Sequence, residues 1–147
     1  MYVLDTNVIS ELMRAEPEEN VLSWAATVDA NEFATTAICE ADILYGITIL
    51  PERKRRKALE EAAKVLFDAK LERRVFPFDS EAAEIYARLR AHRTAIGRPI
   101  KEFDAHIAAI AVAHTSVLVT RDIADFEHMG LELVNPWQIS RRYIRST

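Results

Sequence analysis

Short runs typical of buried β-strands alternate along this chain with longer segments in which apolar residues recur at helical spacing. Strand-like runs occupy residues 2–4, 32–35, 75–78, 116–120 and 131–134, and helical segments occupy 7–13, 17–28, 37–49, 52–71, 80–96 and 101–114. Strands that alternate with helices pair in parallel through right-handed crossovers. The sequence therefore predicts an α/β fold, a three-layer α/β/α sandwich with a central, mainly parallel sheet of about five strands.

Length and composition limit the number of domains, the class of protein and its cellular compartment. The 147 residues fit a single domain spanning 1–147. A net charge of −4 argues against a protein that coats nucleic acid, although it does not exclude an enzyme that acts on it. Cys39 is the single cysteine, and no apolar run approaches a membrane span or follows a basic leader. We expect a cytoplasmic protein without membrane association.

Four acids are placed to meet at one edge of the predicted sheet. Asp5 ends the first strand, and Asp122 follows the fourth by two residues. Asp104 lies near the start of one helix, and Glu40 lies one turn into another. Because ligands of open parallel sheets bind beyond the carboxyl ends of the strands, we expect these carboxylates to converge there.

Each acid except Asp5 also has a plain structural interpretation. Asp104 suits a helix start electrostatically, Asp122 suits a turn with Asp125 as its alternate, and Glu40 suits a solvated helix face. Asp5 ends a buried strand, where an isolated acid is unusual. Thr6 and Asn7 are candidates to cap the following helix, and Thr120 is a polar strand end. The alternative for these three residues is that they help to position a metal-bound water.

Clustered carboxylates indicate a divalent cation. Like charges at short range raise one another's pKa unless a cation compensates them. Oxygen ligands without accompanying histidine or cysteine favour Mg²⁺ or Mn²⁺ over Zn²⁺. Such ions can activate water for attack on a phosphodiester, so phosphodiester hydrolysis is the reaction that these residues suggest.

Four blocks of sequence in this order resemble the PIN-domain ribonucleases. The blocks are residues 4–8, residues 37–41 with Tyr45-Gly46 downstream, residues 103–109 and residues 120–126. Within that family the chain is most similar to VapC-type toxins of bacterial toxin–antitoxin pairs, the FitB-like group in particular. It departs from the commoner pattern at Ala41, where a leucine usually follows the glutamate.

The resemblance implies an endoribonuclease that requires Mg²⁺ or Mn²⁺ and forms a homodimer. Its acidic site would comprise Asp5, Glu40, Asp104 and Asp122, with Asp125 as a further candidate. It also implies a small antitoxin partner that holds the enzyme inactive. The protein would contact operator DNA only through this antitoxin.

Two other functions remain open, and one charged run has two interpretations. An aspartate phospho-transfer domain also places acids at strand ends, although Asp5-Thr6-Asn7 lacks a second acid. A catalytically weak PIN-like module would only bind an antitoxin and operator DNA. The basic run 53–57 either steers RNA toward the acids or forms a solvated helix face, the commoner role of such residues.

Overall fold

A five-stranded parallel sheet forms the centre of the protein in a computed structural model that describes residues 1–138. The strand order is β3-β2-β1-β4-β5, and every neighbouring pair is parallel. The strands are β1 (Tyr2–Leu4), β2 (Phe33–Thr36), β3 (Val75–Phe76), β4 (Val117–Val119) and β5 (Leu133–Val134). The predicted fold class is confirmed.

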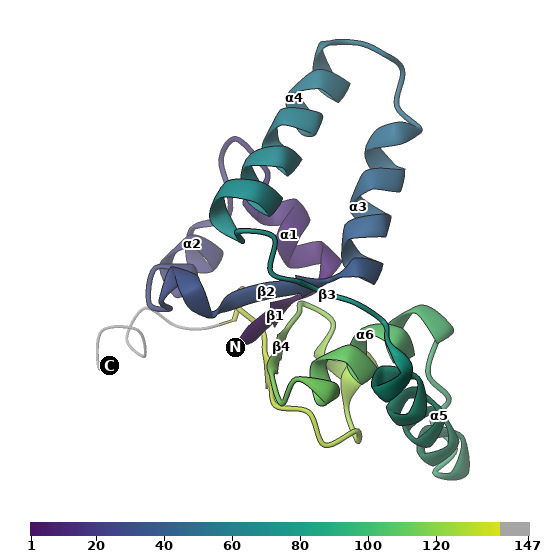
Figure 1. Cartoon of the computed structure of the whole chain (residues 1–147). Coiled ribbons are helices and arrows are strands. Elements are labelled where there is room, and N and C mark those ends of the chain that lie inside the picture. Colours follow the sequence, from purple (N-terminus) through teal and green to yellow (C-terminus); the bar gives the residue numbers. More distant parts are fainter. Residues whose placement is uncertain (139–147) are drawn as a thin grey trace.

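Six α-helices of the described residues cover the two faces of this sheet. They are α1 (Thr6–Leu12), α2 (Glu19–Ala25), α3 (Ala37–Thr48), α4 (Lys54–Lys64), α5 (Ser80–Ala95) and α6 (Glu102–Ala113). Figure 1 shows α1 to α4 on one side of the sheet and α5 and α6 on the other, which gives the three layers. None of the helices within residues 1–138 is both long and apolar enough to span a membrane.

Small side chains allow α6 to pack closely on the sheet. Ala105, Ala108, Ala109 and Ala111 are fully buried, as are the central strand residues around them. Close approach of a helix backbone to a sheet excludes water over a large apolar area, which is the main favourable contribution to folding. The first turn of α6 is thereby fixed at the edge of the sheet where β1 and β4 end.

The long helix predicted over residues 52–71 is divided in the structure. α4 ends at Lys64, and Val65–Lys70 forms a π-helical segment in which the wider turn shifts the hydrogen-bond pattern. The backbone N–H of Leu71 donates to the carbonyl of Leu66 at 2.8 Å, five residues back. This wider turn allows Leu66, Phe67 and Leu71 all to be buried.

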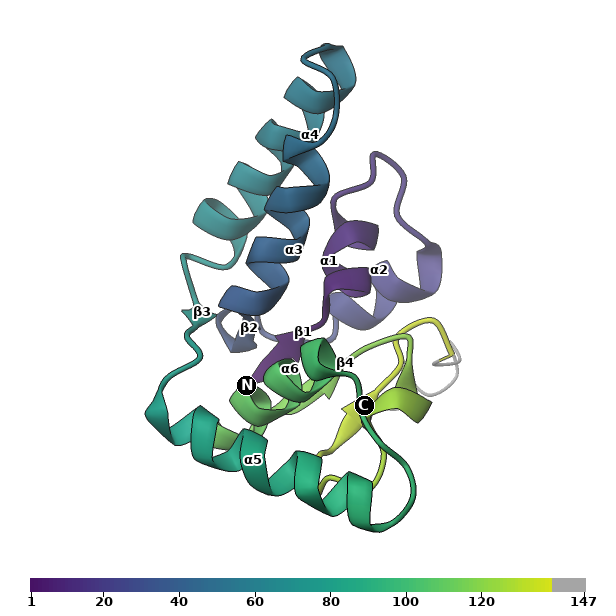
Figure 2. The same cartoon turned by 90° about the vertical axis from the view of Figure 1, so that its right-hand side faces the viewer.

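α3 and α4 form a helical hairpin that projects from the body of the protein, here called the α3–α4 arm (residues 37–64). Both views show the arm extending away from the sheet, while α5 and α6 lie on the opposite side (Figures 1 and 2). The base of α3 begins directly after β2, at Ala37. The arm therefore starts at the edge where the parallel strands end.

The strand order reverses between β1 and β4. From the central β1 the chain moves outward to β2 and β3, then returns across the sheet to β4 and β5. Crossovers on the two sides of such a reversal cover opposite faces, which leaves a crevice beyond the strand ends at that point. The residues that follow β1 and β4 border this crevice.

Candidate active site

Asp5 is held rigidly at the end of β1. Its side chain is only 6% exposed. It caps α1, because Oδ1 accepts a hydrogen bond from the backbone N–H of Thr6 at 2.8 Å, and Oδ2 accepts one from the hydroxyl of Thr120 at 2.7 Å. The thiol of Cys39 lies 3.9 Å from Oδ1. Asp5 is thus fixed by elements from three parts of the sequence.

Burial raises the pKa of Asp5, and two other acids raise it further. The hydrogen bonds from Thr120 and Thr6 lower the pKa, whereas the charges of Asp122 and Asp42 raise it. Burial also raises the pKa of the Cys39 thiol to about 11, with a smaller contribution from Asp5, so this thiol stays protonated. The end of β1 is therefore a place where negative charge is unfavourable without a cation.

Asp122 is oriented by two polar side chains. Its backbone N–H donates to the hydroxyl oxygen of Thr120 at 3.0 Å, so one threonine contacts both Asp5 and Asp122. The side-chain amide of Asn7 donates to Oδ2 of Asp122 at 3.1 Å and accepts from the backbone N–H of Arg121 at 3.3 Å. Asn7 and Thr120 thus link the loop after β4 to the end of β1.

Asp104 carries the clearest electrostatic sign of a carboxylate cluster. It lies in the first turn of α6 and is partly buried. Its pKa is raised to about 6, first by burial and then by the charges of Asp125 and Asp5, with a smaller contribution from Asp122, whereas Lys101 lowers it. The structure therefore brings Asp104 near three other acids at the predicted edge. Their roles in catalysis and metal binding stay predictions.

The contacts of Glu40 are with residues outside this cluster. Its Oε2 forms an ion pair with Nη1 of Arg73 at 2.8 Å, and Asp68 lies 3.5 Å from the same nitrogen. Glu40 lines a groove of about 460 Å³ between α3 and α4, and its charge is not among the largest contributions to the raised pKa of Asp5 or Asp104. The expectation that Glu40 joins the other acids therefore has no support in these contacts.

Asp42 is an acid of α3 whose charge raises the pKa of Asp5, and no pattern in the sequence singled it out. It lines a groove of about 320 Å³ together with Thr6, close to the end of β1. The available signal was helical spacing: residues three apart share a helix face, and Cys39, three residues before Asp42, contacts Asp5. If the helix face that carries the buried Cys39 is taken as the face toward the site, the acid on that face is Asp42.

The sequence pattern of the PIN domain matches residues 2–131 of the chain. This chain belongs to the PIN domain family. The VapC ribonuclease Y4jK of Sinorhizobium fredii is 42% identical over 141 residues, covering 94% of this chain and 99% of that protein. Toxin FitB of Neisseria gonorrhoeae is 34% identical over 137 residues, covering 93% of this chain and 99% of the toxin.

A solved structure of FitAB bound to a DNA fragment contains a chain with the same fold as this PIN domain. The two superpose with a TM-score of 0.88 at 33% identity, covering 96% of this chain and 99% of the other. The similarity extends across the sheet and both helical layers rather than over one motif. It confirms the predicted family, including its VapC and FitB-like relatives.

The donor set of this PIN domain suits a hard divalent cation. Within residues 1–138 no three carboxylate, imidazole or thiolate groups are already close enough to hold a metal ion together. However, Asp5 and Asp104 have raised pKa values, partly because neighbouring acids repel them, and a cation would relieve that repulsion. The buried hydroxyl of Thr6 also lacks a hydrogen-bond partner among residues 1–138. Carboxylates with a hydroxyl nearby fit Mg²⁺ or Mn²⁺.

Removing the Thr120 hydroxyl from this PIN domain should weaken the site without changing its shape. Thr120 is fully buried, and Thr120→Val keeps its volume while losing the bonds to Asp5 and to the N–H of Asp122. We expect affinity for Mn²⁺, measured by titration calorimetry, to fall roughly 10- to 100-fold, as for other groups that orient metal ligands. Thr120→Ser retains the hydroxyl and serves as the control. Wild-type affinity in Thr120→Val would contradict this role.

Proposed function

We propose that this PIN domain is the ribonuclease toxin of a toxin–antitoxin pair and that it hydrolyses RNA phosphodiester bonds with the help of Mg²⁺ or Mn²⁺. The observation that carries the proposal is the group of acids at the crevice between β1 and β4: Thr120 joins Asp5 to Asp122, and the charges of nearby acids add to the burial that raises the pKa of Asp104. The similarity to a VapC ribonuclease and to toxin FitB, over nearly the whole chain, supports the same reaction.

Three carboxylates would hold the metal ion: those of Asp5, Asp104 and Asp122. When bound, the ion supplies an activated water and neutralises the charge that develops on the phosphate. Asp42 and Asp125 add negative charge beside these ligands, since they raise the pKa of Asp5 and Asp104 respectively. We place Asp42, rather than Glu40, in the site as the acid from α3.

The remaining polar residues fix the geometry of these acids. Thr120 donates to Asp5, accepts from the N–H of Asp122 and is completely shielded from solvent, so this residue at the end of β4 holds the acid after β1 and the acid after β4 together. Asn7 orients the carboxylate of Asp122 by a hydrogen bond from its side-chain amide. Arg121, exposed beside Asp122 with its guanidinium 5.0 Å from the centre of the Trp137 ring, can contact a phosphate of the bound strand.

The geometry does not favour an aspartate phospho-transfer domain. Such a domain uses a carboxylate oxygen of the strand-end aspartate as the nucleophile. Both oxygens of Asp5 accept hydrogen bonds within the protein, from the N–H of Thr6 and the hydroxyl of Thr120, and the group is buried. Each oxygen keeps a second lone pair that can bind a cation, but a buried, hydrogen-bonded oxygen is poorly exposed for in-line attack on a phosphoryl group.

Metal removal tests the proposal directly. Purified protein is incubated with RNA in the presence of Mg²⁺, Mn²⁺ or EDTA, and cleavage is followed by gel electrophoresis. We expect cleavage with either ion and none with EDTA, because the repelling acids require a cation to hold water and phosphate together. Cleavage that persists in EDTA would refute the metal mechanism, and absence of cleavage in every condition would refute the nuclease.

A pair of substitutions in α3 distinguishes the two acids of that helix. Asp42→Asn removes a charge that acts on Asp5, so we expect cleavage to fall by roughly tenfold or more. Glu40→Gln breaks only the partly exposed ion pair with Arg73, so we expect cleavage within about threefold of wild type. The initial cleavage rates of the two variants are compared at the same Mn²⁺ concentration. A larger loss in Glu40→Gln than in Asp42→Asn would show that Glu40, and not Asp42, is the acid of α3 that acts in the site.

The proposed partners follow from the relatives. The solved structure named FitAB bound to DNA supports a small antitoxin for this chain, and contact with operator DNA through that antitoxin. A cytoplasmic homodimer organised as a single domain completes the proposal. Co-expression with the protein encoded beside it, followed by size-exclusion chromatography, would show whether such a complex forms and whether it suppresses cleavage. A partner that binds a chain without nuclease activity would support the catalytically weak alternative.

A further inference from the structure

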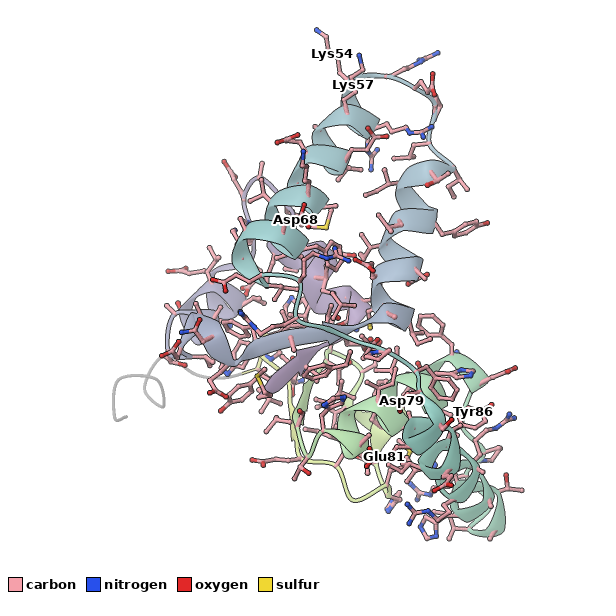
Figure 3. All side chains as sticks on the ribbon, in the orientation of Figure 1. Lys54, Lys57, Asp68, Asp79, Glu81 and Tyr86 are labelled. Atoms are coloured by element: carbon pink, nitrogen blue, oxygen red, sulfur yellow. The ribbon has the colours of Figure 1, made fainter. Side chains whose placement is uncertain are left out.

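Five consecutive cations lie at the far end of the α3–α4 arm, here called the basic tip: Arg53, Lys54, Arg55, Arg56 and Lys57. Figure 3 shows Lys54 and Lys57 at the extremity of the arm, well separated from α5 and α6. The twelve residues of α3 separate the tip from the sheet edge. At a rise of 1.5 Å per residue that distance is about 18 Å.

Most of the basic tip has no partner within the described residues. Arg56 pairs with Glu60 at 2.8 Å and also donates to the carbonyl of Leu50. The other four cations are exposed and form no ion pair in residues 1–138. Elsewhere on the arm and its continuation, Arg73 and Arg74 both pair with acids. The tip is therefore a local concentration of uncompensated positive charge on a protein whose net charge is −4.

The position of these cations is unfavourable for the helix that carries them. α4 begins at Lys54, has no acid in its first turn and lacks a side-chain cap at Arg53. The N-terminus of a helix bears partial positive charge, so lysine and arginine there destabilise it, whereas acids would stabilise it. An ordinary solvated helix face does not require this arrangement. The charges therefore point to a ligand that offsets their mutual repulsion.

We propose that the basic tip binds the phosphate backbone of the RNA at a distance from the bond that is cut. This inference rests on the proposed nuclease function and adds a second contact region for its substrate. Residues 52–57 contain no apolar or aromatic side chain, although protein interfaces place such anchors among their charges. Exposed lysines and arginines without anchors match the sequence-independent recognition of phosphates.

The overall charge of the protein gives an RNA substrate no general attraction, which favours a separate contact region. The acids around Asp104 repel a polyanion, and the net charge of −4 provides no general attraction. A concentrated positive region can still capture RNA and raise its local concentration near the acids. A strand that spans about 18 Å at roughly 3.4 Å per stacked nucleotide contains about five nucleotides. Shorter RNA should reach the acids without touching the tip.

The test compares two double variants on long and short RNA. Lys54→Gln/Lys57→Gln removes two exposed cations from the tip and leaves the contacts of Arg56 intact. Lys70→Gln/Arg88→Gln removes two exposed cations elsewhere and serves as the matched control. Cleavage kinetics with Mn²⁺ are measured on RNA of about 20 nucleotides and of about three nucleotides, lengths chosen to reach or fall short of the tip.

For the long RNA we expect the tip variant to raise KM roughly five- to tenfold with kcat nearly unchanged, and the control to match wild type. For the short RNA all three proteins should behave alike. The dependence of long-RNA binding on salt, measured by fluorescence anisotropy in EDTA, should lose a slope of about 0.7 for each phosphate contact removed.

Two results would overturn this inference. One is equal KM and equal salt slope for the tip variant and the control on long RNA. The other is an equal loss on short RNA, which would mean that the substitutions act through the acids or the fold. Failure of the proposed function is recognised separately, because wild-type protein would then cleave neither RNA while the anisotropy comparison still reports whether the tip binds it.

Discussion

Replacing Asp104 with asparagine should lower RNA cleavage by roughly a thousandfold, as expected for loss of a group that stabilises charge at the reacting phosphate. Asparagine has nearly the same shape but lacks the charge that would hold the cation. Initial cleavage rates with saturating Mn²⁺ measure the loss. Glu102→Gln is the matched control, because Glu102 is an exposed acid in the same first turn of α6. Cleavage by Asp104→Asn within tenfold of the control would contradict the role given to Asp104.

The same substitution should change how the stability of the metal-free protein depends on pH. The pKa of Asp104 is about 6 in the folded protein, mainly through burial, against 3.8 for an ordinary aspartate. An acid whose pKa is higher in the folded than in the unfolded protein binds its proton more tightly when folded. Its contribution to stability is complete below the unfolded-state pKa and is lost as the pH rises through the folded-state pKa. With EDTA present, the melting temperature of the wild-type protein should fall as the pH rises from about 4 to 6, and that of Asp104→Asn should fall less. Identical profiles would contradict the raised pKa.

Replacing Arg93 with methionine should destabilise the folded protein by about 3 kcal/mol, since hydrogen bonds to charged groups contribute roughly 1.5 to 3 kcal/mol each. Arg93 is 6% exposed. Its guanidinium donates to the backbone carbonyls of Arg98 at 2.6 Å, Asp125 at 3.1 Å and Glu127 at 2.9 Å. Methionine fills similar space but leaves these carbonyls without their donor. Because this residue ties α5 to the loop that carries Asp125, affinity for Mn²⁺ should fall as well.

Urea unfolding followed by circular dichroism measures the effect of Arg93→Met. Arg88→Met, on an exposed position of the same helix, should change stability by no more than about 0.5 kcal/mol. Arg93→Lys should recover only part of the loss, since lysine keeps the charge but lacks the fork that reaches several carbonyls. Equal unfolding midpoints for Arg93→Met and Arg88→Met would show that the buried guanidinium does not stabilise the loop.

Periodicity was sufficient to predict the layers of the fold but not the details of every element. The alternation of strands and helices gave the parallel sheet, because each pattern has its own period and the crossover rule leaves few arrangements. The segment 52–71 kept helical periodicity throughout, yet the structure widens to a π-turn after Lys64. Only the surrounding core decides that Leu66 and Leu71 are buried together. β3 ends at Phe76, directly before Pro77, which has no N–H to donate to a neighbouring strand.

The site was predictable where the backbone alone places an acid, and not where a helix face decides. Asp5 and Asp122 follow strands that end at one edge, so their proximity follows from the sheet. In α3, counting residues from the cap indicated Glu40. In the structure Cys39 contacts Asp5, the charge of Asp42 acts on Asp5, and Glu40 pairs with Arg73. The rotation of α3 depends on packing between distant segments, which a single sequence does not reveal.

The central position of β1 governs when the acids can come together during synthesis. β1 leaves the ribosome first, yet its hydrogen-bonded neighbour β4 comes far later, and Asp5 is 115 residues away from the threonine that fixes it. Contacts between such distant residues form late, because closing a long loop costs entropy before any contact is gained. A nascent chain that lacks β4 therefore has neither the crevice nor the paired acids. For the proposed nuclease, activity would then arise only late in folding, when the surface that the proposed partner would recognise is also complete.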